Sequence, residues 1–217
     1  MKKTLLLAFA LFATTSLFAQ SKVKEGTAKY KIDYDLDAEA QEMKAMLPTD
    51  LTIYFKGDKY AAETSGGMMD QKAVTDMKTQ ETTMLMDMMG NKIAMKITKE
   101  DIEKEKNKGK KPKVEITSDT KDIAGFKCTK AIVKSDEGTN VEIWFTKDIA
   151  VNNAFKEGYD GIDGLMMEYS VPQKMFTMKM TCTEVKPGTV DDKIFEIPSD
   201  YKLMTKDELM KMSGGGH

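Results

Sequence analysis

The stretch from Ile123 to Ile149 constrains the fold of this chain most, because it has the pattern of a β-hairpin. Two apolar-rich runs, Phe126 to Val133 and Val141 to Thr146, flank a polar segment that contains Gly138. Glycine readily adopts the positive φ angles that longer hairpin loops need. The stretch also holds the only tryptophan and one of the two cysteines of the chain. We therefore predict two antiparallel strands here, as part of a β-rich fold.

Short segments of alternating character recur along the rest of the chain. Ala28, Tyr30 and Ile32 alternate with lysine and aspartate within residues 26–36. A period of two with one polar face is typical of a half-buried strand. Further strands are predicted at residues 51–56, 59–64, 74–80, 82–89, 93–97, 113–118, 164–171, 175–185 and 192–198.

Few segments favour a helix. Residues 38–47 predict a short one, with Asp37 as N-cap and Pro48 as its stop, and residues 206–212 predict a terminal one. The hydrophilic tract 99–111 is interpreted as a solvated helix and loop in preference to a functional basic patch. Because strands follow one another without an alternating βαβ rhythm, we predict a mainly β fold with a curved or barrel-like antiparallel sheet.

The N-terminus has the organisation of a secretory signal peptide. Lys2 and Lys3 precede an apolar run over residues 5–13, and the small residue Ala19 marks a cleavage point. The apolar run is too short to cross a bilayer, so the alternative is a buried N-terminal helix and not a membrane span. We expect residues 1–19 to be removed and residues 20–217 to form one domain in the periplasm or outside the cell.

The charged residues argue against nucleic acid as a partner. Every basic residue other than the single histidine is a lysine, and the formal net charge is -2. Arginine supplies the bidentate fork that recognises phosphate and guanine, and the chain has none. The sequence therefore predicts no nucleic-acid binding and weakens any assignment as a phosphate-processing enzyme.

Residues for catalysis are scarce. The only histidine is His217, in a glycine-rich end, so a Ser-His-Asp or Cys-His arrangement would have to use it. The chain has neither a Gly-x-Ser-x-Gly motif nor a phosphate-binding glycine-rich loop, and its carboxylates show no distinctive spacing. Zinc would lack ligands. We expect a protein that is not an enzyme, with no catalytic residues, cofactor or metal site of these kinds.

The two cysteines leave two alternatives open. Cys128 and Cys182 form a disulfide, as an oxidising compartment would permit, or remain separate thiols packed as small apolar groups. Gly125 is expected to permit a bend or bulge where the chain enters the long strand. Phe126 and Cys128 would then share a face and pack beneath the strand of Trp144.

Methionine is the most distinctive component, with 19 residues. They cluster at positions 68 and 69, 84 to 89, 166 and 167, and 175 to 180. Three interpretations compete: filling of the core, an adaptable apolar surface for ligands, or thioether ligands for a soft metal such as Cu(I). Two methionines in a Met-x-Met strand lie on one face about 7 Å apart, which is too far for two-point ligation without a neighbouring strand.

Several motifs carry a resemblance to a known family. Residues Thr120 to Cys128, TKDIAGFKC, and Glu142 to Thr146, EIWFT, resemble the DUF4412 family of exported bacterial proteins. Gly161 to Glu168 is similar to the Gly-Leu-Pro-Gly-Leu-Ile segment of the related GLPGLI proteins, with Asp163 in place of proline. Phe195 to Tyr201 also fits the end of DUF4412 proteins.

The resemblance implies a fold and a compartment but no activity. It implies a half-open barrel similar to the LolA/LolB-like lipoprotein carriers: a strongly bent antiparallel sheet around an apolar cavity, with short helices plugging the open side. Residues 38–47 and the tract near Lys99 are the candidate plugs. The family supplies no catalytic residues.

The sequence thus favours an exported, non-enzymatic protein that binds a lipid or other apolar molecule on a concave face of its sheet. A sheet face lined by Met, Ile and Phe could hold an acyl chain, because each buried CH₂ contributes about 0.8 kcal/mol. The expected lining residues are Ile53, Phe55, Met84, Met86, Ile93, Met95, Ile143, Phe145, Met178 and Met180. The alternatives are a methionine-based copper or silver binding protein and a structural protein of the cell envelope without a ligand.

Overall fold

The computed structural model describes residues 22–68, 70–88, 90–106, 112–134, 140–151, 159, 161–173, 175–205 and 208. The predicted signal peptide, the centre of the predicted hairpin turn at 135–139 and nearly all of the predicted helix at 206–212 lie outside these residues. His217 also lies outside them.

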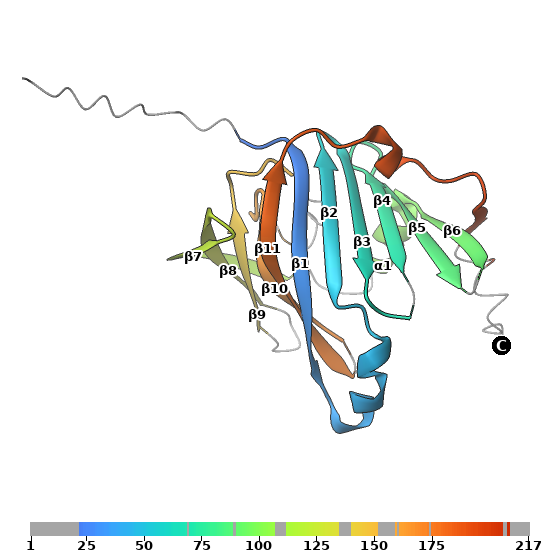
Figure 1. Ribbon diagram of the computed structural model, residues 1–217. Coiled ribbons are helices and arrows are strands. Elements are labelled where there is room, and N and C mark those ends of the chain that lie inside the picture. The colour runs from blue at the N-terminus through green and yellow to red at the C-terminus, as the bar shows by residue number, and fades with distance from the viewer. Residues whose placement is uncertain are drawn as a thin grey trace, which may run out of the picture.

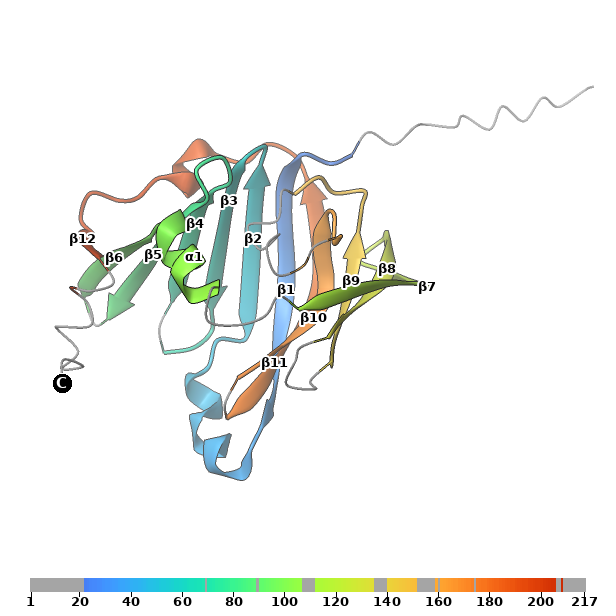
Figure 2. The ribbon, with the colours of Figure 1, turned by 180° about the vertical axis from the view of Figure 1, so that it is seen from behind.

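The described strands form a single twelve-stranded mixed sheet that is not closed into a barrel. The strands are β1 (Glu25–Leu36), β2 (Asp50–Lys56), β3 (Lys59–Ser65), β4 (Gln71–Asp76), β5 (Glu81–Met88), β6 (Asn91–Ile97), β7 (Lys113–Ile123), β8 (Phe126–Lys134), β9 (Asn140–Thr146), β10 (Leu165–Pro172), β11 (Phe176–Pro187) and β12 (Lys202–Thr205). Their order across the sheet is β12-β6-β5-β4-β3-β2-β1-β11-β10-β9-β8-β7. Figures 1 and 2 show β1 and β2 near the middle, with β6 towards one end and β7 at the other.

The predicted mainly β fold is therefore confirmed, but the sheet is not wholly antiparallel. β12 pairs with β6 in parallel, with Met204 opposite Met95. The described helices are the 3₁₀ helices η1 (Ala38–Met46) and η2 (Asp192–Phe195) and the α-helix α1 (Lys99–Lys106). η1 joins β1 to β2 and ends before Pro48, as the sequence predicts, although the side chain of Asp37 makes no capping hydrogen bond.

The organising hairpin is confirmed by the pairing of β8 with β9. Val133 lies opposite Val141, and Ala131 lies opposite Ile143. A second hairpin precedes it, because Ile123 pairs directly with Phe126 across a two-residue turn. Both turn residues, Ala124 and Gly125, have positive φ angles of 49° and 83°, as in the type I′ turns that suit twisted hairpins. Gly125 thus serves a tight turn at the point where the chain enters β8, in place of the expected bend or bulge.

Three further elements differ from expectation. β4 is shifted towards the N-terminus relative to the predicted strand 74–80, and Asp76 accepts hydrogen bonds from the amides of Lys78 and Thr79 in the turn that ends it. Residues 192–198, predicted as a strand, instead begin with η2, because the Asp191 carboxylate accepts a hydrogen bond from Lys193 N and caps a helical turn. The strand β12 was not predicted.

The hydrophilic tract begins as a helix, as predicted. α1 starts with a reciprocal cap: Asp101 N donates to Thr98 Oγ1 at 3.2 Å, and Thr98 N donates to the Asp101 carboxylate at 2.9 Å. Figure 2 shows α1 in front of the sheet, and it lies behind the sheet in Figure 1.

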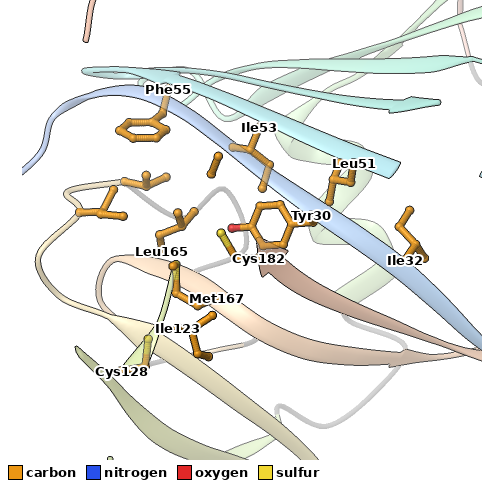
Figure 3. Close-up of a cluster of buried hydrophobic side chains, with 13 residues drawn as sticks. Tyr30, Ile32, Leu51, Ile53, Phe55, Ile123, Cys128, Leu165, Met167 and Cys182 are labelled. Carbon is orange, nitrogen blue, oxygen red and sulfur yellow. The ribbon is translucent and has the colours of Figure 1, made fainter. Parts of the chain in front are cut away.

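Two clusters of buried side chains make up the core. The first core cluster contains Ala28, Tyr30, Ile32, Leu51, Ile53, Phe55, Ile123, Cys128, Ile149, Val151, Leu165, Met167 and Cys182. The second core cluster contains Ala131, Val133, Ile143, Phe145 and Ile162. In Figure 3, Tyr30 and Ile53 from β1 and β2 point towards Leu165 and Cys182 from β10 and β11.

A hydrogen bond crosses the first core cluster. The hydroxyl of Tyr30 donates to the carbonyl oxygen of Met166 at 2.8 Å, which links β1 to β10 over the intervening strand β11. The ring of Tyr30 also meets the ring of Tyr169 edge-on, with 6.4 Å between centroids. Side-chain contacts thus join β1 to β10, in addition to the backbone hydrogen bonds between neighbouring strands.

The segment after β11 runs back across β3 and reaches the edge of the sheet at β6. Lys59 Nζ contacts Asp192 Oδ1 at 2.9 Å, and Lys92 Nζ contacts Asp200 Oδ2 at 2.6 Å. Val190 N donates to the Glu25 carboxylate at 2.8 Å. These polar contacts position β12 beside β6.

Candidate functional site

A row of apolar side chains follows β5 and β6 on one face of the sheet. Met84 pairs with Met95, and Met86 pairs with Ile93. Directly paired residues of antiparallel strands lie on the same face, so these four side chains are neighbours. All four are half-buried. We call Met84, Met86, Ile93 and Met95 the methionine row.

The local sequence explains why the row forms. Gly90, with a φ angle of 88°, belongs to the turn that joins β5 to β6. This short turn sets the register of the two strands. The alternate residues of β5, Thr83 and Leu85, lie on the opposite face and are only 7% and 3% exposed. The methionine row therefore belongs to the more open of the two faces at this end of the sheet.

Cross-strand pairing extends the row towards the core. Met84 lies opposite Ala73, Ala73 opposite Ala62, and Ala62 opposite Ile53. The two alanines are half-buried and have the smallest side chains of this line. The line therefore runs from buried Ile53 to half-buried Met84. Between them, the only side chains on this line are the methyl groups of the two alanines.

The expected lining residues divide into two groups. The half-buried ones are Met84, Met86, Ile93, Met95, Met178 and Met180. The fully buried ones are Ile53, Phe55, Ile143 and Phe145, which are 2%, 1%, 1% and 0% exposed. Ile53 and Phe55 belong to the first core cluster, and Ile143 and Phe145 to the second. These four side chains have packing partners in place of a ligand.

Met178 and Met180 lie apart from the methionine row. They stand on β11 opposite Tyr34 and Ile32, and both pack against the first core cluster. The structure thus brings together the members from β5 and β6 and leaves those from β11 on the other side of β1 and β2.

Both cysteines are free and buried, so the disulfide alternative is not formed. Burial raises the pKa of each thiol to about 11. The Cys128 thiol donates to the carbonyl of Phe126 at 3.3 Å, and the Cys182 thiol donates to that of Glu184 at 3.5 Å. Protonated thiols without access to solvent are poor nucleophiles, so both have a packing role.

Charged side chains surround Trp144 on the other half of the sheet. Lys121 Nζ lies 4.4 Å from the centroid of the indole ring and 2.9 Å from Glu168 Oε1. Lys130 Nζ lies 5.9 Å from the same centroid and 2.7 Å from Glu142 Oε1. Sequence reasoning missed this cluster, because only the register of β7 to β10 brings its members together. Each carboxylate is paired with a lysine of another strand. We therefore interpret the cluster as cross-strand ion pairs and not as an acid/base pair.

The described residues contain neither a metal-binding cluster nor a membrane-spanning helix. No group of three or more histidine, cysteine, aspartate or glutamate residues in the described part of the chain could hold a metal ion. Among the same residues, no helix has the length and apolar character needed to cross a bilayer.

Comparisons with known proteins identify relatives of the fold. A family profile described as "N-glycanase peptide, N-terminal domain" matches residues 36–195. The structure resembles PNGF-II in a C2 crystal, with a TM-score of 0.54 and 17% identity over 87% of this chain and 32% of that chain. It resembles PNGF-II in a P21 crystal with a TM-score of 0.52 and 15% identity, over 87% and 33% of the two chains.

A third structure has a similar size. An uncharacterised conserved protein from Thermus thermophilus gives a TM-score of 0.51 at 9% identity, over 85% of this chain and 91% of that one. Our chain therefore spans about a third of PNGF-II, whereas it spans nearly all of the Thermus protein. A search of curated proteins by sequence found no match.

These findings correct the resemblance drawn from the motifs. The profile match over residues 36–195 and the likeness to PNGF-II replace the assignment to DUF4412, to GLPGLI proteins and to the LolA/LolB-like group. Local backbone geometry accounts for the motif glycines: Gly125 forms a hairpin turn together with Ala124. Gly164 is needed because a Cβ atom there would collide with the carbonyl oxygen of Thr146.

Proposed function

This chain belongs to the family of N-glycanase peptide N-terminal domains, and from that premise we propose that it is a non-enzymatic protein that binds an apolar ligand. The ligand would be a lipid acyl chain or another apolar molecule held against the methionine row. The protein would be exported, with residues 1–19 as its signal peptide.

The observation that carries the proposal is the half-buried methionine row. Four large apolar side chains, paired across β5 and β6, remain partly open while Leu85 and Ala94 on the reverse face are buried. Methionine is unbranched and flexible, so such a row adapts to apolar molecules of different shape. Burial of part of an acyl chain would contribute about 0.8 kcal/mol for each CH₂ group.

A half-open barrel would give this row an enclosed setting. The first core cluster joins Phe55 of β2 to Cys128 of β8, although β1, β11, β10 and β9 lie between these strands in the sheet. A cluster shared by strands so far apart in the sheet order supports a bent sheet. We propose that the bend continues towards β6, and that η1 and α1 close parts of the open side.

The proposal assigns binding and not catalysis to this chain. The chain spans about a third of PNGF-II, and the carboxylates near Trp144 are each paired with a lysine. We propose that any glycan chemistry of the larger relatives depends on the part that this chain does not cover.

The test is native mass spectrometry of the protein purified without detergent, followed by titration with a fluorescent fatty acid. We expect an adduct of several hundred daltons on the purified protein or saturable binding of the probe. Replacement of Met84, Met86 and Met95 together by glutamine, which has a similar length but a polar amide, should weaken probe binding at least about tenfold.

The matched control replaces Met43, Met46 and Met68 by glutamine, since these methionines are 38%, 48% and 64% exposed and lie outside the row. This variant should bind the probe like the unmodified protein. Equal binding by both triple variants would show that the row is not the binding surface. A protein that binds no lipid in either assay would leave a structural role in the envelope.

A further inference from the structure

Three of the most exposed methionines gather at one end of the sheet. Met43 and Met46 lie on η1, and Met68 lies in the connection between β3 and β4. They are 38%, 48% and 64% exposed, whereas Met167 in the first core cluster is 0% exposed. Core packing therefore does not account for these three side chains.

The geometry of η1 places two of the thioethers side by side. In a 3₁₀ helix, side chains three positions apart eclipse one another along one edge. Ala40, Met43 and Met46 share such an edge, and Ala40 is 0% exposed. The edge thus begins at a buried residue, whereas Met43 and Met46 further along it are exposed. Lys44, the basic residue of the last turn, is one position away from Met43 and lies off the edge.

A backbone contact brings Met68 next to the C-terminal end of η1. Met68 N donates a hydrogen bond to the carbonyl oxygen of Met46 at 3.1 Å. The chain passes so close that a Cβ atom on Gly67 would lie 2.7 Å from that same oxygen. The backbone thus holds Met68 against the end of η1.

We propose that the thioethers of Met43, Met46 and Met68 form a binding site for a soft monovalent metal ion, Cu(I) or its redox-inert counterpart Ag(I). Thioether sulfur is a soft, neutral donor that selects Cu(I) over hard ions such as Mg²⁺ and Ca²⁺. The ion keeps its charge on binding, so no electron or proton is transferred.

The cysteines and the methionine row are less suited to such a site. Cys128 and Cys182 are buried, and burial raises the pKa of both thiols to about 11, which disfavours the thiolate that metals require. Met84 and Met95 share one face of a strand pair and belong to the row assigned to the apolar ligand.

The experiment is titration of the purified full chain with silver nitrate in chloride-free buffer, read by native mass spectrometry. One variant carries Met43→Leu, Met46→Leu and Met68→Leu, and its matched control carries Met84→Leu, Met86→Leu and Met95→Leu. Leucine keeps the apolar volume and removes only the sulfur. We expect the first variant to hold one silver ion fewer than the unmodified protein and the control to hold the same number.

The single substitution Met68→Leu should weaken silver binding by at least roughly tenfold, because a three-ligand site becomes a two-ligand site. Since all three residues are exposed, thermal unfolding by circular dichroism should be unchanged, which separates loss of the site from loss of the fold. No bound silver on the unmodified protein, or the loss of an ion from the control instead, would overturn the proposal.

The result is independent of the proposed apolar ligand. The variant at Met43, Met46 and Met68 leaves the methionine row unchanged, so it should still bind the fluorescent fatty acid if that proposal holds. Failure of fatty-acid binding with an intact silver pattern would reject the proposed function alone.

Discussion

The central half of the sheet, around β1 and β2, and the outer half, around β5 and β6, carry large apolar side chains on the same face. Other side chains cover this face only in the central half. Ile53 and Met84 lie on a single cross-strand line, joined through Ala62 and Ala73. Ile53 is 2% exposed, whereas Met84 is half-buried. Register therefore decides which face a side chain occupies, and contacts from distant strands decide whether that face is covered.

The central half is covered by its own distant strands. Side chains of β1 and β2 meet those of β10 and β11 (Figure 3). The hydroxyl of Tyr30 also donates to the backbone carbonyl of Met166. The row on β5 and β6 has no member in either core cluster. The first half thus supplies stability, and the second carries the surface that we propose for binding.

The sharpest test of this contrast compares Phe55→Ala with Met86→Ala. Phe55 is 1% exposed in the first core cluster, so its truncation should lower the free energy of unfolding by about 3 to 5 kcal/mol. Truncation of half-buried Met86 should cost about 1 kcal/mol or less. Urea denaturation followed by circular dichroism measures both. Equal losses would mean that the two halves are packed alike.

The second-largest effect is expected at high pH, which should destabilise the central half. Burial raises the pKa of Cys128 and Cys182 from 9.0 to about 11, and burial raises the pKa of Tyr30, Tyr60 and Tyr169 above the ordinary 10.0. The folded state keeps protons that the unfolded chain releases. The contribution of these groups to the free energy of unfolding is therefore fully present below pH 9. It is lost as the pH rises through 9 to 11 and beyond, by at most about 1.4 kcal/mol per group and pH unit.

Denaturation midpoints at pH 8, 10 and 11 would follow this loss, and tyrosinate absorbance would report when the rings ionise. We expect the absorbance rise of the buried tyrosines to coincide with unfolding. Ionisation of all tyrosines near pH 10 with the fold intact would show that the central half is open to solvent.

A smaller effect is expected from Tyr30→Phe. The variant keeps the ring but removes the hydroxyl that donates to Met166 O at 2.8 Å, and this partly buried carbonyl is left without that donor. The free energy of unfolding should fall by about 1 to 2 kcal/mol. Tyr34→Phe is the matched control, because its hydroxyl also donates to a carbonyl, that of Pro48, from a less buried position. A larger loss in the control would contradict the assignment of the core.

The smallest effect concerns the surface beyond the core. Lys121→Ala removes an ion pair with Glu168 and the cation over Trp144, but the lysine side chain is 36% exposed, so stability should change by less than about 1 kcal/mol. Because Trp144 is the only tryptophan, its fluorescence should still change clearly. Lys130→Ala should change it less, since Lys130 Nζ is 5.9 Å from the ring centroid.

Sequence reasoning succeeded where local pattern decides the structure. The strands around Val133 and Val141 and the pairing of Met84 with Met95 follow from period-two alternation across short turns. The grouping of the methionine row could therefore be predicted. Its open surroundings could not, because burial depends on strands far away in the chain.

Failures occurred where a distant or local partner overrides the pattern. Ile194 and Phe195 are strand-forming residues, but Asp191 caps a helical turn there. β12 has four residues and pairs with β6 from over a hundred positions away, and no local signal marks it. Phe145 looked like a lining residue, yet it is 0% exposed because the second core cluster surrounds it.

The position of β1 has a consequence for how the protein is made. Its two neighbours are β2, which follows at once, and β11, which ends at Pro187. During synthesis, β1 to β6 can assemble from successive hairpins, but one edge of β1 stays bare until almost the whole chain has emerged. Contacts between distant segments form slowly, and a bare strand edge can pair with another chain. We therefore expect closure of the β1–β11 seam to limit the rate of folding and the same seam to be the weak point for aggregation.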